Sequence, residues 1–406
     1  MIKAVLLDLD DTLIATRIDT FFPLYLRELG EYSSRFAPPE EFIERLMGAF
    51  YKTIRAYEPS DPLYPRLMRH LTSAFGIDEA ALDLHFDAFY GERYGALRGN
   101  IQPRAGSLRL LDLLFERGIQ VVVATNPGLP YAAISQRMAW GGIPPERYNF
   151  ALITSLEEMH FGKPYAEYYA EIAARLDVEP GEALMVGDDW GNDIVGAAEA
   201  GLHTYWVTPG NAQPPLGDVP LDGCGTYEQF IDAVDAGWLD TLICEDSGRT
   251  ALIHRLAAYP AAVDAVRRPH PRAVLECCPG EAEWSSRDVV CHLCEHEREE
   301  RTRLQRILTE SNPFLSANAS SQAAGGRYQD MAFEEAFKSW VEHRADTLAW
   351  LRSIPAEDWV RPARDAIFGP TYFQEMVGFM AEHDRTHLHQ MQDAIAYALT
   401  ACEGEA

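Results

Sequence analysis

The sequence predicts an α/β domain followed by an all-α domain. Short apolar runs alternate with helical periodicity from residue 1 to about residue 210, a pattern typical of a Rossmann-like, doubly wound parallel sheet. One long stretch, residues 14–102, interrupts this alternation with helical periodicity alone. From residue 248 to about residue 400 the pattern is helical throughout, so we expect a second domain there.

The composition fits a two-domain protein that acts on a small molecule. A chain of 406 residues is long for one domain, and 47% hydrophobic with 24% charged residues is ordinary for packed cores. The formal net charge of −27 argues against nucleic acid and against an anionic membrane as partners. The negative net charge does not exclude a phosphorylated substrate, because a bound cation and a lysine make the electrostatic potential at the site positive.

Cysteine usage and the amino-terminal segment predict a reduced, cytoplasmic protein. The seven cysteines are odd in number and unevenly spaced, which does not suggest a disulfide framework. The first apolar run, Val5–Leu7, is interrupted by Asp8 and is too short for a signal peptide. No apolar run approaches the roughly 20 residues that a membrane span needs.

The first strand-like run ends in two carboxylates. Val5–Leu7 leads into Asp8 and Asp10, and Thr12 follows. Side chains of a strand alternate between its faces, so two carboxylates at positions i and i+2 share a site where the chain leaves the strand. That place is the carboxyl edge of a parallel sheet, where open α/β folds bind ligands. Crowded carboxylates repel one another unless a cation holds them, and Mg²⁺ is the natural partner.

Three later segments place further polar groups after apolar runs. The run 120–124 ends in a hydroxyl and an amide, a Gly-Lys-Pro sequence precedes a helical stretch, and the run 183–186 ends in a second acidic cluster. A hydroxyl, a lysine and acidic groups are the side chains that phosphate chemistry uses. The groups in question are Thr125, Asn126, Lys163, Asp188, Asp189 and Asp193.

Taken in order, these motifs resemble the haloacid dehalogenase (HAD) superfamily of phosphohydrolases. The resemblance covers roughly residues 1–240, with a core of residues 1–13 and 103–240. In that superfamily an insertion directly after the first motif is a helical, C1-type cap over the active site, so residues 14–102 are expected to form such a cap. An ordinary extra helical domain is the alternative. The segments with helical periodicity are Phe21–Leu29, Glu40–Tyr51, Leu63–Phe75 and Glu79–Tyr90.

The resemblance implies a role for each motif residue. Asp8 would be the nucleophile that forms an aspartyl-phosphate, and Asp10 would be the general acid and then the general base. Mg²⁺ would be held by Asp8, the Asp10 backbone carbonyl and Asp188. Asp193 and Asp189 would hold metal-bound water or contact the residues that bind the metal. The groups that would bind the phosphoryl oxygens are Thr125, Asn126 and Lys163.

Within the superfamily, the acidic residues favour a phosphatase. A dehalogenase needs the carboxylate nucleophile but neither Asp10 nor a metal, whereas Asp10, Asp188 and Asp193 are all present. A sugar-phosphate mutase and an inactive scaffold remain the alternatives. The substrate would be a small phosphorylated metabolite, and cap residues would select it. The polar candidates in the cap are Thr16, Arg17, Arg27, Tyr51, Lys52, Arg55 and Tyr57.

The second domain reads as a four-helix bundle with one long crossover. A polar connection, residues 310–328, separates the second and third helical segments. This spacing predicts that one of the connections between the helices of the bundle is long. The four helical segments are Thr250–Arg267, Ser285–Thr309, Met331–Leu351 and Thr371–Leu399.

Histidines of this bundle indicate a second metal site. His383 and His387 are four residues apart and therefore lie on one helix face. Together with the segment Trp284–Leu293, this His-x-x-x-His-x-x-Gln sequence is similar to the DinB-like bundles, a family related to thiol-dependent S-transferases. The family places one histidine of the second helix and two of the fourth around a divalent metal. Carried over, the ligands are His292, His383 and His387, and the ion would be Zn²⁺ or Ni²⁺.

Other interpretations of the bundle stay open. A cluster of cysteines with one histidine could hold zinc or an iron–sulfur cluster, although mid-helix cysteines are often simply buried. The bundle could carry the main activity, as a thiol-dependent S-transferase, or serve only oligomerisation or sensing. A homodimer is one assembly open to the chain. The competing cluster comprises Cys277, Cys278, Cys291, Cys294 and His296.

Overall fold

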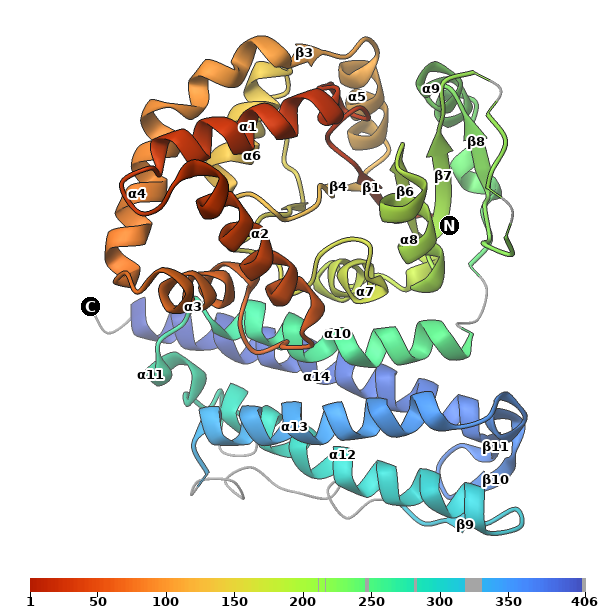
Figure 1. Ribbon diagram of the computed structural model, residues 1–406. Coiled ribbons are helices and arrows are strands. Elements are labelled where there is room, and N and C mark those ends of the chain that lie inside the picture. The colour runs from red at the N-terminus through yellow and green to blue at the C-terminus, as the bar shows by residue number, and fades with distance from the viewer. Residues whose placement is uncertain (211, 216, 245–247, 281–282, 318–330, 404–406) are drawn as a thin grey trace. The chain divides into compact units, whose positions relative to one another are not determined.

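The computed structural model (Figure 1) divides the chain into two compact units, Met1–Asp246 and Ser247–Ala406. It describes residues 1–210, 212–215, 217–244, 248–280, 283–317 and 331–403. Side chains are described as far as residue 400. Part of the segment between the two predicted domains, residues 245–247, and most of the predicted crossover, residues 318–328, lie outside these ranges.

The first unit is built on a parallel sheet with strand order β5-β4-β1-β6-β7-β8. The apolar run of β1 is completely buried between β4 and β6, with Leu6 opposite Val122 on one side and Met185 on the other. A strand without alternation is expected where both faces of a parallel sheet are covered. The described strands are β1 (Ala4–Leu7), β4 (Gln120–Val123), β5 (Leu152–Ile153), β6 (Ala183–Gly187), β7 (His203–Val207) and β8 (Gly223–Gly225).

Helices between the strands complete this Rossmann-like core. Helix α5 packs against β4 and α9, and α7 packs against α8. Thr226 and Gln229 form a capping box that begins α9. The described core helices are α5 (Ser107–Glu116), α6 (Tyr131–Trp140), α7 (Ala166–Arg175), α8 (Gly196–Glu199) and α9 (Tyr227–Asp235).

The insertion after the first strand is helical, as the sequence predicts. Two short strands, β2 (Ile14–Ala15) and β3 (Gln102–Pro103), pair in antiparallel fashion where the chain enters and leaves it. Gly76, at φ +66°, ends α3, and Asp78 caps α4 through its contact with the Ala80 N–H. The four helices, red to orange in Figure 1, are α1 (Ile18–Tyr32), α2 (Pro39–Arg55), α3 (Leu63–Phe75) and α4 (Glu79–Glu92).

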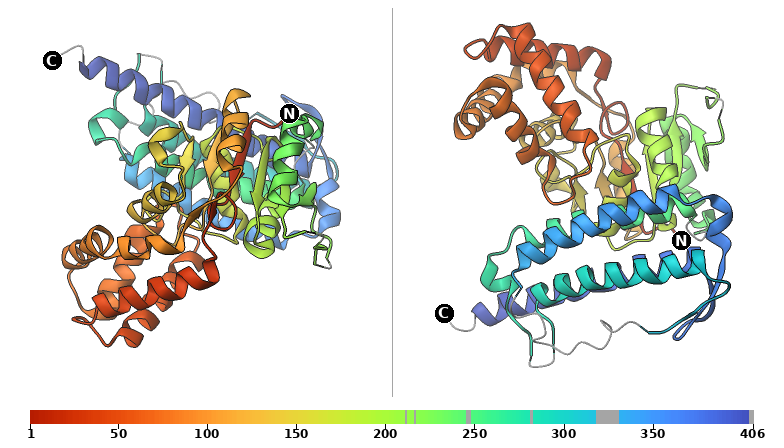
Figure 2. Two further views of the ribbon diagram at one scale, coloured as in Figure 1. Left: turned by 90° about the horizontal axis from the view of Figure 1, so that it is seen from above. Right: turned by 60° about the horizontal axis from the view of Figure 1, so that its bottom comes forward.

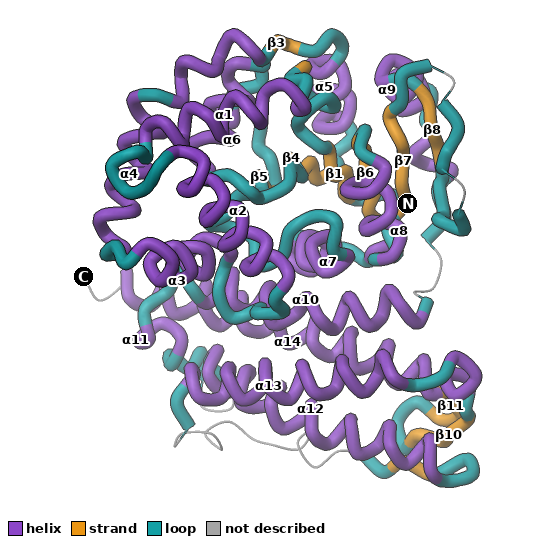
Figure 3. Tube along the Cα trace, in the orientation of Figure 1, coloured by secondary structure: helices purple, strands orange, loops and turns teal. Residues whose placement is uncertain are grey.

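The second unit is a helix bundle, and Figure 3 shows that most of this unit is helix. Helix α12 contacts α13 and α14, and α10 also contacts both of these. Figure 2 shows α12 and α13 side by side along their length. Ser285 begins α12 with a capping box, because its Oγ accepts from the Asp288 N–H. The long described helices are α10 (Arg249–Arg267), α12 (Ser286–Thr309), α13 (Phe333–Ser353) and α14 (Phe373–Glu403).

Two small features of this bundle were not predicted. A short helix, α11 (Arg272–Leu275), contacts α14. A small sheet joins β9 (Phe314–Leu315), β10 (Pro362–Asp365) and β11 (Gly369–Tyr372). Strands of two to four residues have too little periodicity to be recognised in a sequence, and β10 and β11 also contain a proline. In the described part of the chain, no helix combines the length and apolarity that crossing a membrane requires.

Candidate functional site

The carboxyl ends of β1 and β6 bring two acidic segments together. Asp8 directly follows β1, and its backbone N–H donates to the Val186 carbonyl oxygen of β6 at 2.9 Å. Asp188 directly follows β6. Neighbouring parallel strands end at the same edge of the sheet. As a result, one carboxylate oxygen from each of Asp8, Asp188 and Asp193 lies within 4.8 Å of the others.

Lys163 lies inside this acidic cluster. Its side chain is 2% exposed, and its Nζ donates to Asp8 Oδ1 at 2.8 Å and to Asp193 Oδ1 at 2.5 Å. Burial alone would lower the pKa of Lys163, but the carboxylates of Asp193 and Asp8 raise it well above its usual range. The ammonium group is therefore charged at neutral pH and fixes the position of the Asp8 side chain.

The loop after β6 is shaped to hold Asp193. Its Oδ2 accepts from the Asp189 N–H at 3.0 Å. A Cβ on Gly187 would lie 2.1 Å from this oxygen, so the close approach requires a glycine. The Asp189 side chain is exposed and accepts from the Asn192 N–H at 2.8 Å, which caps a π-helical segment, Trp190–Val195. Asp189 thus stabilises the loop that places Asp193.

The protonation behaviour of the cluster fits a cation site. Burial, and then the charges of Asp8 and Asp11, raise the pKa of Asp188 to about 7. Burial also raises the pKa of Asp193, although Lys163 opposes this effect. A hard divalent cation would compensate the negative charge of carboxylates that converge in this way.

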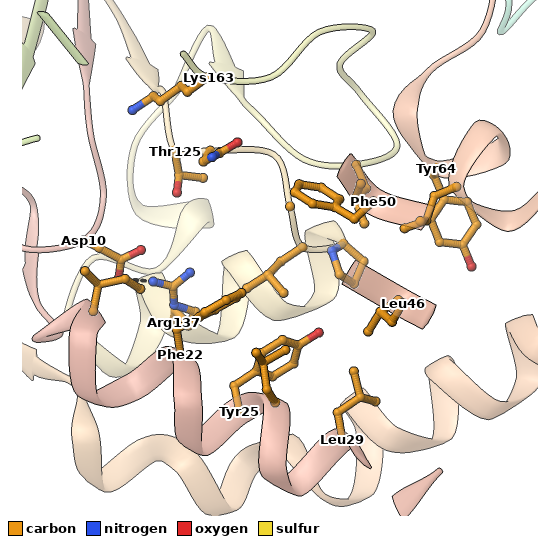
Figure 4. Close-up of a pocket in the computed structure, with 18 of the residues that line it drawn as sticks. Asp10, Phe22, Tyr25, Leu29, Leu46, Phe50, Tyr64, Thr125, Arg137 and Lys163 are labelled. Atoms are coloured by element: carbon orange, nitrogen blue, oxygen red, sulfur yellow. Dashed lines mark hydrogen bonds and ion pairs between the residues drawn. The ribbon is translucent and has the colours of Figure 1, made fainter. Parts of the chain in front are cut away.

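Arg137 is a residue of this site that the sequence did not reveal. It lies in α6, is 3% exposed and donates to the carboxylate of Asp10 (Figure 4). Its guanidinium carbon lies 5.0 Å from the centre of the Phe21 ring in cap helix α1. Burial lowers the pKa of Arg137 to about 10, so the guanidinium still carries its charge at neutral pH. The pair is 127 positions apart in the chain, so no local motif signals it.

Asp11 joins the loop after β1 to the first cap helix. Its backbone has φ +53°, a left-handed conformation that aspartate adopts more readily than most residues. Its Oδ1 accepts from the Arg17 N–H at 2.8 Å, and its Oδ2 accepts from the Ile18 N–H at 3.0 Å. The carboxylate therefore satisfies backbone donors at the start of α1. A cap residue is normally adjacent to its helix, so this distant one escapes sequence analysis.

Thr125 and Asn126 lie in the same cavity as the acidic cluster. Thr125 is 4% exposed, and its backbone carbonyl accepts from the Tyr168 hydroxyl at 2.9 Å and from the Thr154 hydroxyl at 2.7 Å. The Asn126 side chain is exposed to the cavity. Figure 4 shows Thr125 and Lys163 near each other at one end of the cavity. The structure thus brings together the residues that the sequence motifs singled out.

The cavity has a volume of about 380 Å³ and extends from these polar groups into the cap. Its cap side is mainly apolar. None of the seven polar cap residues suggested by the sequence is among the described residues that line it. The apolar faces of the cap helices line the cavity instead, and several of the polar residues, such as Lys52 and Arg55, are exposed elsewhere. Examples of the apolar lining are Phe22, Tyr25, Leu29, Leu46, Phe50 and Met68.

Three histidines converge in the bundle of the second unit. The Nε2 atom of His383 lies 2.9 Å from Nε2 of His292 and 3.1 Å from Nε2 of His387. His387 Nδ1 lies 2.8 Å from Gln390 Oε1, so this N–H donates to the amide oxygen and Nε2 keeps its lone pair. The indole of Trp284 stacks on His387 with ring centres 5.6 Å apart. Such convergence of imidazole nitrogens suits a divalent transition metal.

Burial keeps the imidazoles of His383 and His387 neutral. It lowers the pKa of His383 far below the usual range, and the neighbouring imidazoles of His296 and His387 add to this effect. Burial also lowers the pKa of His387 and of His296. His296 stacks on His383 with ring centres 3.5 Å apart, and its Nε2 lies 3.6 Å from Glu300 Oε1. Neutral imidazole is the form that binds a metal.

A buried ion network lies next to the histidines. Arg344 is fully buried in α13, and its guanidinium contacts Glu297 of α12 at 2.6 Å and Asp384 of α14 at 2.8 Å. It also donates to the Leu256 carbonyl of α10 at 2.7 Å. Burial raises the pKa of Asp384 to about 7, although Arg344 acts in the opposite direction. One arginine thus joins all four long helices.

The cysteines of the bundle do not form a metal cluster in the described ranges. The groups that could hold an ion there contain carboxylates or histidines only. Cys291 and Cys294 are buried and free, and burial raises the pKa of the Cys291 thiol to about 12 and that of Cys294 to about 11. Protonated, buried thiols are poor ligands and nucleophiles.

Comparison with known protein families agrees with this division of the chain. The family model of haloacid dehalogenase-like hydrolases matches residues 2–201, and that of the DinB superfamily matches residues 248–391.

Curated relatives of the first unit include phosphatases. The pyrimidine 5′-nucleotidase PynA of Streptococcus pneumoniae is 28% identical over 59% of this chain and 98% of its own length. The glyceraldehyde 3-phosphate phosphatase of Pyrococcus abyssi is 26% identical over 52% of this chain and 83% of its own length. The phosphoserine phosphatase of Thermus thermophilus is 31% identical over 37% of this chain and 56% of its own length.

Solved structures resemble each unit separately. A HAD phosphatase from Thermococcus onnurineus is 20% identical, covers 58% of this chain and 98% of its own, and has a TM-score of 0.38. YfiT from Bacillus subtilis, a four-helix-bundle protein, is 17% identical, covers 37% of this chain and 89% of its own, and has a TM-score of 0.34.

Proposed function

We propose that this chain, a HAD-family phosphatase domain followed by a DinB-superfamily bundle, is a Mg²⁺-dependent phosphohydrolase of a small phosphorylated metabolite. The observation that carries the proposal is the cluster at the sheet edge, where Lys163 contacts both Asp8 and Asp193 and Asp188 lies beside them. Relatives of the first unit with phosphatase names support the same reaction class. The net charge of −27 supports a small substrate rather than nucleic acid.

Asp8 is the proposed nucleophile. Its carboxylate attacks phosphorus, the bond from phosphorus to the ester oxygen breaks, and an aspartyl-phosphate forms. Lys163 holds Asp8 from the side and remains charged, so it also attracts the phosphoryl oxygens. Thr125 and the Asn126 backbone N–H complete the proposed phosphoryl-binding group.

Asp10 is the proposed acid and base. It gives a proton to the departing alkoxide and later removes one from the water that attacks the aspartyl-phosphate, so alcohol and inorganic phosphate are the products. Arg137 holds the Asp10 carboxylate. We therefore assign Arg137 as the residue that positions Asp10 between the two steps.

The donor set fits Mg²⁺. Asp8, Asp188 and Asp193 converge, and burial together with the neighbouring charges of Asp8 and Asp11 raises the pKa of Asp188. Asp8, the Asp10 backbone carbonyl and Asp188 would hold the ion, with Asp193 behind them. When bound, Mg²⁺ would neutralise charge on the phosphoryl oxygens.

A second metal is proposed for the bundle. The converging imidazoles of His292, His383 and His387 would hold Zn²⁺ or Ni²⁺, and three histidine ligands would leave one coordination position open. An open position would suit a thiol-dependent transfer reaction, which is the second candidate activity of this chain. A bundle that serves only assembly or sensing would bind no substrate.

Phosphate release from a panel of phosphorylated metabolites tests the main proposal. We expect release by the wild-type protein with Mg²⁺, and background rates for Asp8→Asn or in excess chelator. A matched control is Asp222→Asn, an aspartate of the same unit that pairs with His203 at the start of β7, the opposite edge of the sheet. This variant should keep the wild-type rate.

Two outcomes would contradict the proposal. Release that persists in Asp8→Asn would exclude the aspartyl-phosphate. Interconversion of sugar phosphates without net release of phosphate would identify a mutase instead. The homodimer and the cytoplasmic location remain predictions of the sequence.

A further inference from the structure

The cavity above the acidic cluster has two chemically different ends. Figure 4 shows Asp10, Thr125 and Lys163 on one side and cap residues such as Tyr25, Leu29 and Leu46 on the other. With a volume of about 380 Å³, the cavity falls within the range of small-molecule sites. A substrate therefore places its phosphoryl group among the charges and the rest of its structure against the cap.

The cap end offers apolar surface and few free polar partners. Helices α1 and α2 contribute Phe22, Leu29, Leu46 and Phe50. The buried hydroxyls of Tyr25 and Tyr90 lie 2.9 Å apart and bond to each other. Burial raises the pKa of Tyr25 to about 12, so its hydroxyl stays neutral.

Charge on the lining also restricts the substrate. Among the described residues that line the cavity, the cationic side chains are Lys163 and Arg137, and both already pair with carboxylates of the cluster. The cap end carries Asp87, and Glu157 lies in the loop beside it. A second phosphate or a carboxylate on the substrate would find no cation there and would face these two acids.

We propose that the preferred substrate is a monophosphate ester of a bulky, uncharged apolar alcohol. This inference rests on the proposed phosphatase activity and specifies its substrate class. Small, charged phosphoesters such as phosphoglycolate and phosphoserine would leave the apolar end unfilled and would place a carboxylate against Asp87 or Glu157.

A homologous series of n-alkyl phosphates, from methyl to octyl, tests this proposal on the full-length protein with Mg²⁺. The longer alcohols are nearly equal as leaving groups, so chain length changes mainly the contact with the cap. Each buried methylene should raise kcat/KM by about threefold until the cavity is full. Octyl phosphate should also exceed 8-phosphooctanoate, its analogue with a terminal carboxylate, by at least about tenfold.

Substitutions of a cap residue test whether the cap causes the preference for long, uncharged chains. Phe22→Arg places a cation at the half-exposed edge of the cavity, so we expect a flatter chain-length series and a gain for 8-phosphooctanoate relative to octyl phosphate. Phe22→Leu keeps an apolar side chain and should preserve the preference. If Phe22→Arg loses the preference and Phe22→Leu keeps it, the loss is due to the introduced charge and not to misfolding.

Three results would overturn the inference while leaving the phosphatase intact. These are an Asp8-dependent rate that is independent of chain length, equal rates for octyl phosphate and 8-phosphooctanoate, and faster turnover of UMP or CMP than of octyl phosphate. If no phosphoester is hydrolysed in an Asp8-dependent manner, the proposed function itself fails.

Discussion

The two clusters of side chains that could hold a metal ion have opposite chemistry. At the sheet edge, the carboxylates of Asp8, Asp188 and Asp193 surround a buried lysine. In the bundle, three imidazoles converge, and the buried arginine lies behind them in a separate ion network. A cluster of buried carboxylates needs a cation inside it for stability, whereas a cluster of neutral imidazoles does not.

The same comparison predicts different metals. Carboxylate oxygens favour a hard ion that exchanges readily, such as Mg²⁺. Imidazole nitrogens favour Zn²⁺ or Ni²⁺ and hold them more tightly. Substitutions at single positions can test this difference between the two clusters.

Removing one imidazole should abolish metal binding by the bundle. His383 lies between the other two histidines, and its loss leaves a pair that cannot enclose an ion. We expect His383→Ala to lower the bound transition metal from about one ion per chain to none, as measured by elemental analysis of the full-length protein. His389→Ala, on the same helix, should retain the metal.

Phosphate release by His383→Ala should equal that of the wild type, because the carboxylate cluster is in the other unit. A full complement of zinc or nickel in this variant would refute the three-histidine site. Loss of phosphatase activity would show that the two clusters are not independent.

Breaking the buried network of the bundle should reduce its stability strongly. Arg344→Met leaves Glu297 and Asp384 as buried carboxylates without their partner. Removing one partner of a buried ion pair typically costs about 3–5 kcal/mol. Hydrogen exchange of α12, α13 and α14 in the full-length chain should accelerate accordingly, while β1 and β6 exchange as before.

Glu297→Gln combined with Asp384→Asn in the Arg344→Met background provides the matched control. With both carboxylates neutral, part of the lost protection should return. If Arg344→Met alone exchanges like the wild type, the network contributes nothing to stability.

Removing the arginine beside Asp10 should slow the phosphatase without unfolding it. In Arg137→Met the Asp10 carboxylate loses the group that holds it, so we expect kcat to fall by about 10²-fold. KM should change less, because the phosphoryl-binding groups remain. Arg137→Lys should recover part of the rate. An unchanged kcat in Arg137→Met would assign the pair to stability alone.

The smallest predicted effect is a pH dependence of the cap. His85 is 2% exposed and bonds to Ser33 Oγ at 2.9 Å, and burial lowers its pKa to about 4. The folded-state pKa lies below the unfolded value of roughly 6.5. Its neutral form therefore favours folding above that value, and this contribution is lost as pH falls from about 6.5 towards 4. After correction for the intrinsic exchange rate at each pH, the protection of α1 and α4 against hydrogen exchange should be lower at pH 5 than at pH 7.

His85→Phe should remove much of this dependence, because its ring has a similar shape and carries no proton. An equal pH effect in wild type and variant would place the titrating group elsewhere in the cap.

Local patterns in the sequence anticipated much of the fold. The runs at β1, β4 and β6 are apolar without alternation, and helix α3 has the bounds that its helical periodicity predicts, with Gly76 directly after its end. The histidine pair of α14 was visible because positions i and i+4 share a face. Signals of this kind lie within a few residues of one another.

Long-range features escaped the sequence analysis. Arg137 looked like an ordinary helix residue, because its partner Asp10 is 127 positions away. The cap residues expected to select the substrate were chosen for polarity, yet the cavity is lined by residues such as Leu29 and Phe50. Apolar residues of an amphipathic helix look the same whether they face a packed core or a ligand cavity.

The short ladder between Ile14–Ala15 and Gln102–Pro103 has a consequence for how new specificities arise. This ladder holds the two ends of the cap side by side. The cap is therefore a loop whose ends are already closed where they join the core. The entropy of closing a loop rises only with the logarithm of its length, by about 0.6 kcal/mol for each doubling. A cap of different size or lining can therefore be exchanged at this junction while the strand ends that carry Asp8 and Asp188 keep their register. The four residues of this ladder thus allow the cap to be replaced as a unit.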